Sequence, residues 1–282
     1  MSASYRKETD FLCTPVILAI LLLEGFVTIS VEILTIRQMI PVVGNTVIVT
    51  SLIIGVFLLF LAMGYSRGGR YKQNYRYILI RNFIIAAALL GVGLSYEFIH
   101  SFFSWSYAIL TVSPLWVLTA YLLVIIAPTV YLLGQTVPIT TNLLKPNPHV
   151  GSISGKVLFL STIGSFMGAV LTTLVLMNYI GVAATVCVNY LLLFILILLL
   201  LTEYNRILTY SPILISLALL MPVYRFNVTY EKQQFIATDA YANYKVSEVK
   251  DESSGKKFKL FQVNDSSSSL ISKDLQAAPY IE

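Results

Sequence analysis

Seven long apolar stretches dominate the sequence before Pro222, and each approaches the length of a membrane span. A helix needs about 20 apolar residues to cross the hydrocarbon layer of a bilayer. The chain is 57% hydrophobic and 12% charged, whereas a soluble domain has about 25% charged residues. We therefore predict an all-α polytopic membrane helix bundle with about seven transmembrane helices. The expected spans are Leu12–Leu34, Thr46–Met63, Tyr77–Tyr96, Leu115–Leu133, Val157–Met177, Ala183–Thr202 and Ile207–Met221.

A change in composition divides the chain into a transmembrane domain, residues 1–223, and a soluble tail, residues 224–282. Polar and apolar residues alternate over Tyr244–Val249 and again over Lys257–Val263, with a glycine-containing turn between them. This pattern predicts a small β-hairpin. The serine-rich segment Asn264–Ser269 is expected to be another turn or loop. Because a lone hairpin is marginally stable in water, the tail is expected to need a partner surface, on the bundle, on another copy or on another chain.

Lysine and arginine gather on one side of the expected bundle. Cytoplasmic loops are enriched in these residues. The loops Glu97–Pro114 and Asn178–Val182, on the opposite side, contain neither, and the exception there is Arg37 at the outer end of the first helix. We expect an integral protein of a bacterial inner membrane, with its N-terminus in the cytoplasm and its tail outside. The charged residues that set this orientation include Arg6, Arg67, Arg70, Lys72, Lys145 and Arg206.

Aromatic residues also gather in the outer loops. Trp105 and Trp116, with Tyr96 and Tyr107, indicate an aromatic belt at the membrane–water interface.

The composition also excludes several kinds of site. Two cysteines and two histidines are too few for a disulfide scaffold, a four-thiolate site or a histidine cage, so no metal is expected. No P-loop, dinucleotide fingerprint, GxSxG or HExxH motif occurs, so no cofactor is expected. The tail carries 8 basic and 8 acidic residues, which gives no positive field for nucleic acid.

Two carboxylates, Glu24 and Glu32, lie within the first apolar stretch. Eight positions turn a helix by about 80°, so the two share roughly one face. Ionisable groups at membrane depth suggest function, because burying them is costly. Both are candidates for binding a cationic substrate or relaying protons. The alternative is a structural role, which for Glu32 could be a pair with Arg37.

Three further segments indicate local structure. The polar segment Gly134–Thr141 could line a cavity, or it could be an ordinary helix end with a connecting loop. The segment Pro41–Asn45 is expected to form a tight external turn, because proline and glycine break helices. Gly164 and Gly168 form a GxxxG motif, which favours close helix packing within the bundle over a dimer seam.

Three segments in the membrane half resemble one family. They are Glu32–Pro41 followed by Gly44-Asn45, then Gly55-Val-Phe with Gly64–Arg70, and finally Gly151–Val170. In this order they resemble the membrane-bound spermidine synthase-like proteins. The resemblance implies a multi-helix membrane domain joined to a polyamine aminopropyltransferase-like domain, which opens with a β-hairpin and continues into a Rossmann-like fold.

The tail resembles the opening of that second domain. Tyr244-Lys-Val through Phe261 resembles its first hairpin, and Pro279–Glu282 resembles the stretch before the Rossmann-like part. The resemblance makes Tyr280 a candidate for a substrate contact. The family's catalytic aspartate and donor site would lie beyond Glu282, so no catalytic or cofactor-binding residue is assigned, and the chain alone is expected to be inactive.

We therefore expect the membrane half of a spermidine synthase-like protein, truncated or split, that anchors or assembles with a separate Rossmann-like partner docked on the hairpin. One alternative is a transporter or channel for a cationic small molecule such as a polyamine. Another is a non-catalytic membrane scaffold subunit. The bilayer is an expected partner in each case, and the formation of a homo-oligomer stays an open alternative.

Overall fold

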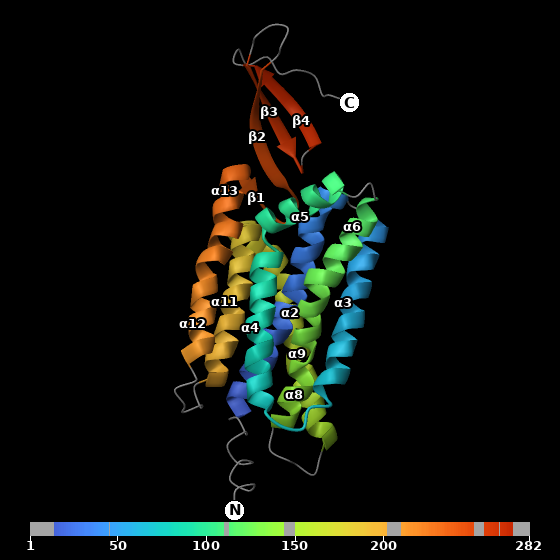
Figure 1. Ribbon diagram of the computed structural model, residues 1–282, viewed down its shortest axis with the longest axis vertical. Helices are drawn as coiled ribbons and strands as arrows, with labels where there is room; N and C mark the ends of the chain where they lie inside the picture. The colour runs from blue at the N-terminus through green and yellow to red at the C-terminus, as the bar shows by residue number, and fades with distance from the viewer. Residues whose placement is uncertain are drawn as a thin grey trace, which may run out of the picture.

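A helical bundle with a small β-sheet at one end forms the protein (Figure 1). The computed structural model describes residues 14–44, 46–109, 113–143, 150–201, 210–250, 257–264 and 266–272. Among these residues, seven helices are long and apolar enough to cross a membrane, which confirms the predicted bundle. The first helix begins at the end of the bundle opposite to the sheet (Figure 1).

The helices follow the predicted spans but differ at their ends. The first five are α2 (Thr14–Val43), α3 (Val47–Gly68), α4 (Tyr75–Gly93), α5 (Tyr96–Ile109) and α6 (Pro114–Tyr121). The middle part contains α7 (Ala127–Gly134), α8 (Thr136–Leu143), α9 (Val150–Leu171) and α10 (Met177–Ile180). The last three are α11 (Val182–Leu201), α12 (Tyr210–Tyr224) and α13 (Tyr230–Gln234). Wider π-helical turns join α6 to α7, α9 to α10 and α12 to α13.

The sheet contains four antiparallel strands in sequence order. They are β1 (Ala237–Thr238), β2 (Asn243–Lys250), β3 (Lys257–Val263) and β4 (Ser266–Ser272). The predicted hairpin is confirmed, because β2 pairs with β3 in the register Tyr244 to Val263. The expectation of a loop over Asn264–Ser269 is wrong, since most of that segment belongs to β4. Pairing with β3 overrides the weak strand preference of serine.

The first helix is longer than predicted. It continues through Pro41, which was expected in a turn, and the chain reverses at Gly44 with a φ of 94°. Proline removes one i→i−4 hydrogen bond. At Pro41 this loss falls in the last turn, so the helix reaches Val43 before it ends.

Two other expectations on the sheet side are corrected. The loop expected over Glu97–Pro114 contains the 14-residue helix α5. The last helix runs beyond the expected domain boundary at residue 223 and reaches Gln234, because the polar side chain of Asn227 is buried and bonded inside the bundle. Its Nδ2 donates to the carbonyl oxygens of Gly91 and Val223 at 2.9 and 2.8 Å.

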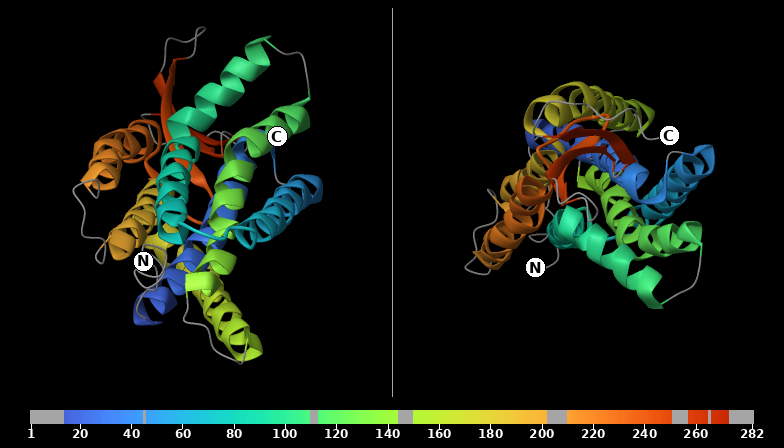
Figure 2. Two further views of the ribbon diagram at one scale, coloured as in Figure 1. Left: turned by 60° about the horizontal axis from the view of Figure 1, so that its bottom comes forward. Right: turned by 90° about the horizontal axis from the view of Figure 1, so that it is seen from above.

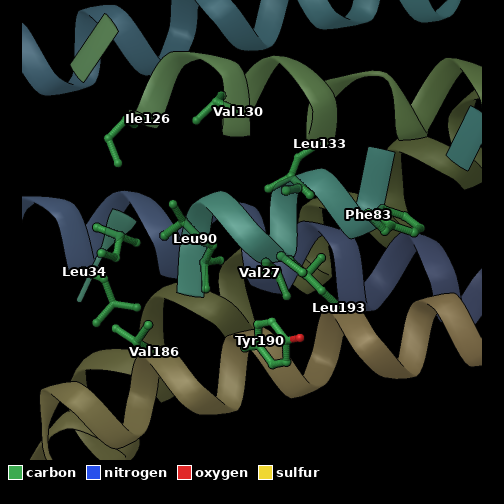
Figure 3. Close-up of a cluster of buried hydrophobic side chains, with 14 of the residues drawn as sticks. Val27, Leu34, Phe83, Leu90, Ile126, Val130, Leu133, Val186, Tyr190 and Leu193 are labelled. Atoms are coloured by element: carbon green, nitrogen blue, oxygen red, sulfur yellow. The ribbon is translucent and has the colours of Figure 1, made fainter. Parts of the chain in front are cut away.

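The apolar core lies between α2, α4, α7 and α11 (Figure 3). Burial removes these side chains from both water and lipid, so close packing holds them together. The labelled residues are Val27 and Leu34 of α2, Phe83 and Leu90 of α4, Ile126, Val130 and Leu133 around α7, and Val186, Tyr190 and Leu193 of α11.

Glycines bring the backbones of α2 and α9 into direct contact. A Cβ added at Gly164 would overlap the carbonyl oxygen of Leu22, and one at Gly168 would overlap that of Phe26. From the other side, a Cβ at Gly25 would overlap the carbonyl oxygen of Ser161. The GxxxG motif therefore packs within the bundle, as predicted.

Replacing Gly164 by alanine is expected to destabilise the bundle, because the added methyl group must push α2 away from α9. Overpacking of this kind costs about 1–3 kcal/mol. The matched control is Gly55→Ala on α3, where the methyl group meets nothing within 4 Å and alanine favours the helix. Thermal unfolding in one detergent compares the two variants. An unchanged midpoint for Gly164→Ala would contradict the backbone contact.

Candidate functional site

The Glu24 carboxyl lies inside the bundle, where its residue is only 2% exposed. Thr28, one turn later on α2, donates a hydrogen bond of 2.8 Å from its hydroxyl to Oε1. The other carboxyl oxygen, Oε2, is buried and has no hydrogen-bond partner among the described residues. Glu24 is therefore a polar group at membrane depth whose bonding capacity is not filled.

Two neighbouring helices face this carboxyl. Ser161 of α9 places its hydroxyl near Glu24, beside the glycine contacts of α2 with α9. Tyr65 of α3 is close enough to interact with Glu24 electrostatically. The hydroxyl groups of Thr28 and Ser161 thus lie next to the carboxyl, and Tyr65 interacts with it through its charge.

The second predicted carboxylate, Glu32, is in a different environment, because it is half-buried. Arg37 was suggested as its partner, but this arginine bonds to the sheet instead. In the part of the chain that the structure describes, no hydrogen bond links Glu32 with Glu24.

The polar segment Gly134–Thr141 forms a sharp turn and the helix α8, and most of its polar side chains bond within the bundle, whereas the buried Thr136 hydroxyl has no hydrogen-bond partner among the described residues. Gln135 accepts a hydrogen bond of 3.0 Å from Asn82 of α4. The hydroxyl of Thr140 donates to the carbonyl of Thr136, and that of Thr141 to the carbonyl of Val137. No hydrogen bond among the described residues joins this segment to Glu24.

A second polar cluster lies where the sheet meets the bundle, and we name it the root network. It consists of Arg37, Tyr96, Glu231, Thr238, Asp239 and Asn243. The Nε of Arg37 donates to the carbonyl oxygen of Asp239 at 2.9 Å, and Nη2 donates to Oδ1 of Asn243 at 2.8 Å. The Tyr96 hydroxyl donates to the same Oδ1 at 3.0 Å. The start of β2 is thus bonded to both α2 and α5.

Glu231 and Thr238 fix the other side of the root network to α11. The first backbone N–H groups of a helix have no partner within that helix. Here the N–H of Ala183 donates to Glu231, and that of Val182 donates to the Thr238 hydroxyl, both at 3.1 Å. The Thr238 hydroxyl in turn donates to Glu231. The partial positive charge at the N-terminus of α11 also stabilises the negative charge of Glu231.

Asp239 shapes the tight turn between β1 and β2. Its Oδ1 accepts hydrogen bonds from the N–H groups of Tyr241 and Ala242 at 2.7 and 2.9 Å. Burial raises the pKa of this carboxyl, but these two amides, the Tyr244 hydroxyl and the charge of Arg37 together outweigh burial and lower the pKa below its ordinary value. Asp239 is therefore ionised at neutral pH and holds the turn in place.

Sequence reasoning singled out Glu24, which is buried in the bundle, and missed the root network. Arg37 gave the available signal, because it was the one basic residue on the side that otherwise lacks them. Tyr96, expected in the aromatic belt, is buried and bonded to Asn243 instead. The third predicted site residue, Tyr280, lies outside the described residues. Among those described, no group of three metal-ligating side chains occurs.

Comparisons of the chain with protein-family models, with curated proteins and with solved structures found no match.

Replacing Arg37 by alanine is expected to loosen the sheet from the bundle, because Asn243 and the Asp239 carbonyl lose their charged donor. Hydrogen bonds from charged groups contribute about 1.5–3 kcal/mol each. Hydrogen–deuterium exchange should show faster exchange at the amides of Ala242 and Asn243. Arg70→Ala, at an exposed position, is the control. Equal exchange in both variants would refute the role of Arg37.

Proposed function

We propose that this chain is the membrane half of a spermidine synthase-like assembly, and that its sheet receives a separate Rossmann-like partner. The observation that carries the proposal is the sheet itself. The root network fixes its base, and its strands extend beyond the end of the helical bundle (Figure 1). A small sheet is stable when another surface covers its apolar side. Its position at the end of the bundle leaves room for that surface.

Among the described residues, no further strand pairs with either edge of the sheet. β1 pairs with only Asn243 and Tyr244, so the rest of β2 forms one edge, and β4 forms the other. Open edges bind extended segments of other chains. Both edges thus support a docking role.

In the half of the sheet nearest the bundle, one face is also more apolar than the other. Tyr244 lies opposite Val263, and Val246 opposite Phe261, so these four side chains share a face. Val246 is 40% exposed, and the rings of Tyr244 and Phe261 stack at 6.3 Å. We assign this apolar face, rather than the Ser247 face, to the partner.

Deleting Tyr244–Glu282 is expected to abolish capture of the partner and to leave membrane insertion intact, because the deletion starts after the last of the seven candidate spans, which ends at Gln234. The test is co-purification of the tagged chain with the Rossmann-like product of the neighbouring reading frame. Val246→Asp should weaken capture by charging the apolar face, and Ser247→Asp on the opposite face is the matched control.

Unchanged capture after the deletion would show that the partner does not dock on the sheet. Absence of a neighbouring reading frame for a Rossmann-like chain would favour the scaffold alternative. A reporter fused after Glu282 tests the predicted side of the tail.

A second candidate function, a path for a cationic small molecule, is favoured by the unfilled oxygen of Glu24. A buried carboxylate gains much from pairing with a cation. Glu24→Gln keeps the size of the side chain and the acceptor for Thr28 but removes the charge. It should abolish polyamine uptake into liposomes that contain the full chain, whereas Glu32→Gln should reduce uptake less. Absence of uptake by the unmodified chain would exclude this function.

A further inference from the structure

Helix α5 lies across the end of the bundle on the sheet side, rather than along the spans (Figure 2). It follows the span Tyr75–Gly93 and precedes the span Pro114–Leu143, so it lies at the level where these two spans end. With 14 residues it is too short to cross a bilayer. A helix in this position lies at the membrane–water boundary or above it.

The distribution of polar and apolar residues over the faces of α5 distinguishes these two positions. Ile99, Phe103 and Ser106 are buried against the bundle, and Glu97, Ser101 and Ser104 lie on the opposite face. Positions i, i+4 and i+7 share one side of a helix. The helix is therefore amphipathic, with a polar face directed away from the protein core.

A flank between these two faces is aromatic and apolar. Trp105 and Ile109, one turn apart, are 63% and 59% exposed. On α6, Trp116 is 70% exposed, and Leu123, seven positions later in the π-helical turn that follows α6, is 47% exposed. The exposed side of the fourth span thus continues without interruption to Trp116.

We propose that the bilayer surface on the sheet side binds this corner, with Trp105, Ile109 and Trp116 inserted at the level of the lipid headgroups. Tryptophan prefers this level because its ring is apolar and its N–H is polar. Between Phe98 and Trp116 the sequence contains no Asp, Glu, Lys or Arg, so insertion buries no full charge there. The polar face of α5 then meets water, as in helices that lie in the interface plane.

The chain provides its own probes, because Trp105 and Trp116 are its 2 tryptophans. The full chain is reconstituted in vesicles of phosphatidylcholine brominated either near the headgroup or near the chain end. Trp105→Phe and Trp116→Phe each leave one emitting ring. For both variants we expect a larger loss of emission with shallow bromine than with deep bromine, and little loss with aqueous acrylamide.

A matched control places the single emitting ring on the polar face. Ser101→Trp in the Trp105→Phe/Trp116→Phe background should respond to acrylamide and much less to brominated lipid. Stronger quenching of either native ring by acrylamide than by lipid would overturn the proposal, as would stronger quenching by deep bromine. Equal quenching of native Trp105 and of the ring introduced by Ser101→Trp would also overturn it.

Discussion

The direct contact between the backbones of α2 and α9 is the interaction on which the bundle depends. In lipid, apolar side chains gain little from leaving their surroundings, so helices associate where small residues let their backbones meet. Gly25, Gly164 and Gly168 provide that approach. The same contact brings Ser161 next to Glu24, so the main packing seam also forms the surroundings of the buried carboxyl.

The second constraint is that polar groups at the ends of the spans need partners. Arg37, Glu231 and the first amides of α11 meet this need through the sheet. The strands are therefore a structural continuation of the bundle and not a flexible appendage. Because of this connection, a partner docked on the sheet would hold a fixed position relative to the membrane.

Much of this architecture could be predicted because its signals are local. Apolar length revealed the spans, alternation revealed β2 and β3, and a carboxylate in an apolar run revealed Glu24. Helix α5 was missed because it is short and mixes serine with aromatic residues, and β4 was missed because serine rarely indicates a strand. The root network was invisible to such reasoning, since Arg37 and Asn243 lie 206 positions apart in the sequence.

The length of α2 has one more consequence. Its 30 residues span about 45 Å, which exceeds the roughly 30 Å of hydrocarbon. The helix is therefore long enough for its last turns, including Arg37, to extend into the zone where lipid gives way to water. A protein captured by the strands there would search for its substrates and its neighbours along a plane instead of through a volume. Its encounters with other molecules in the same membrane would become correspondingly more frequent.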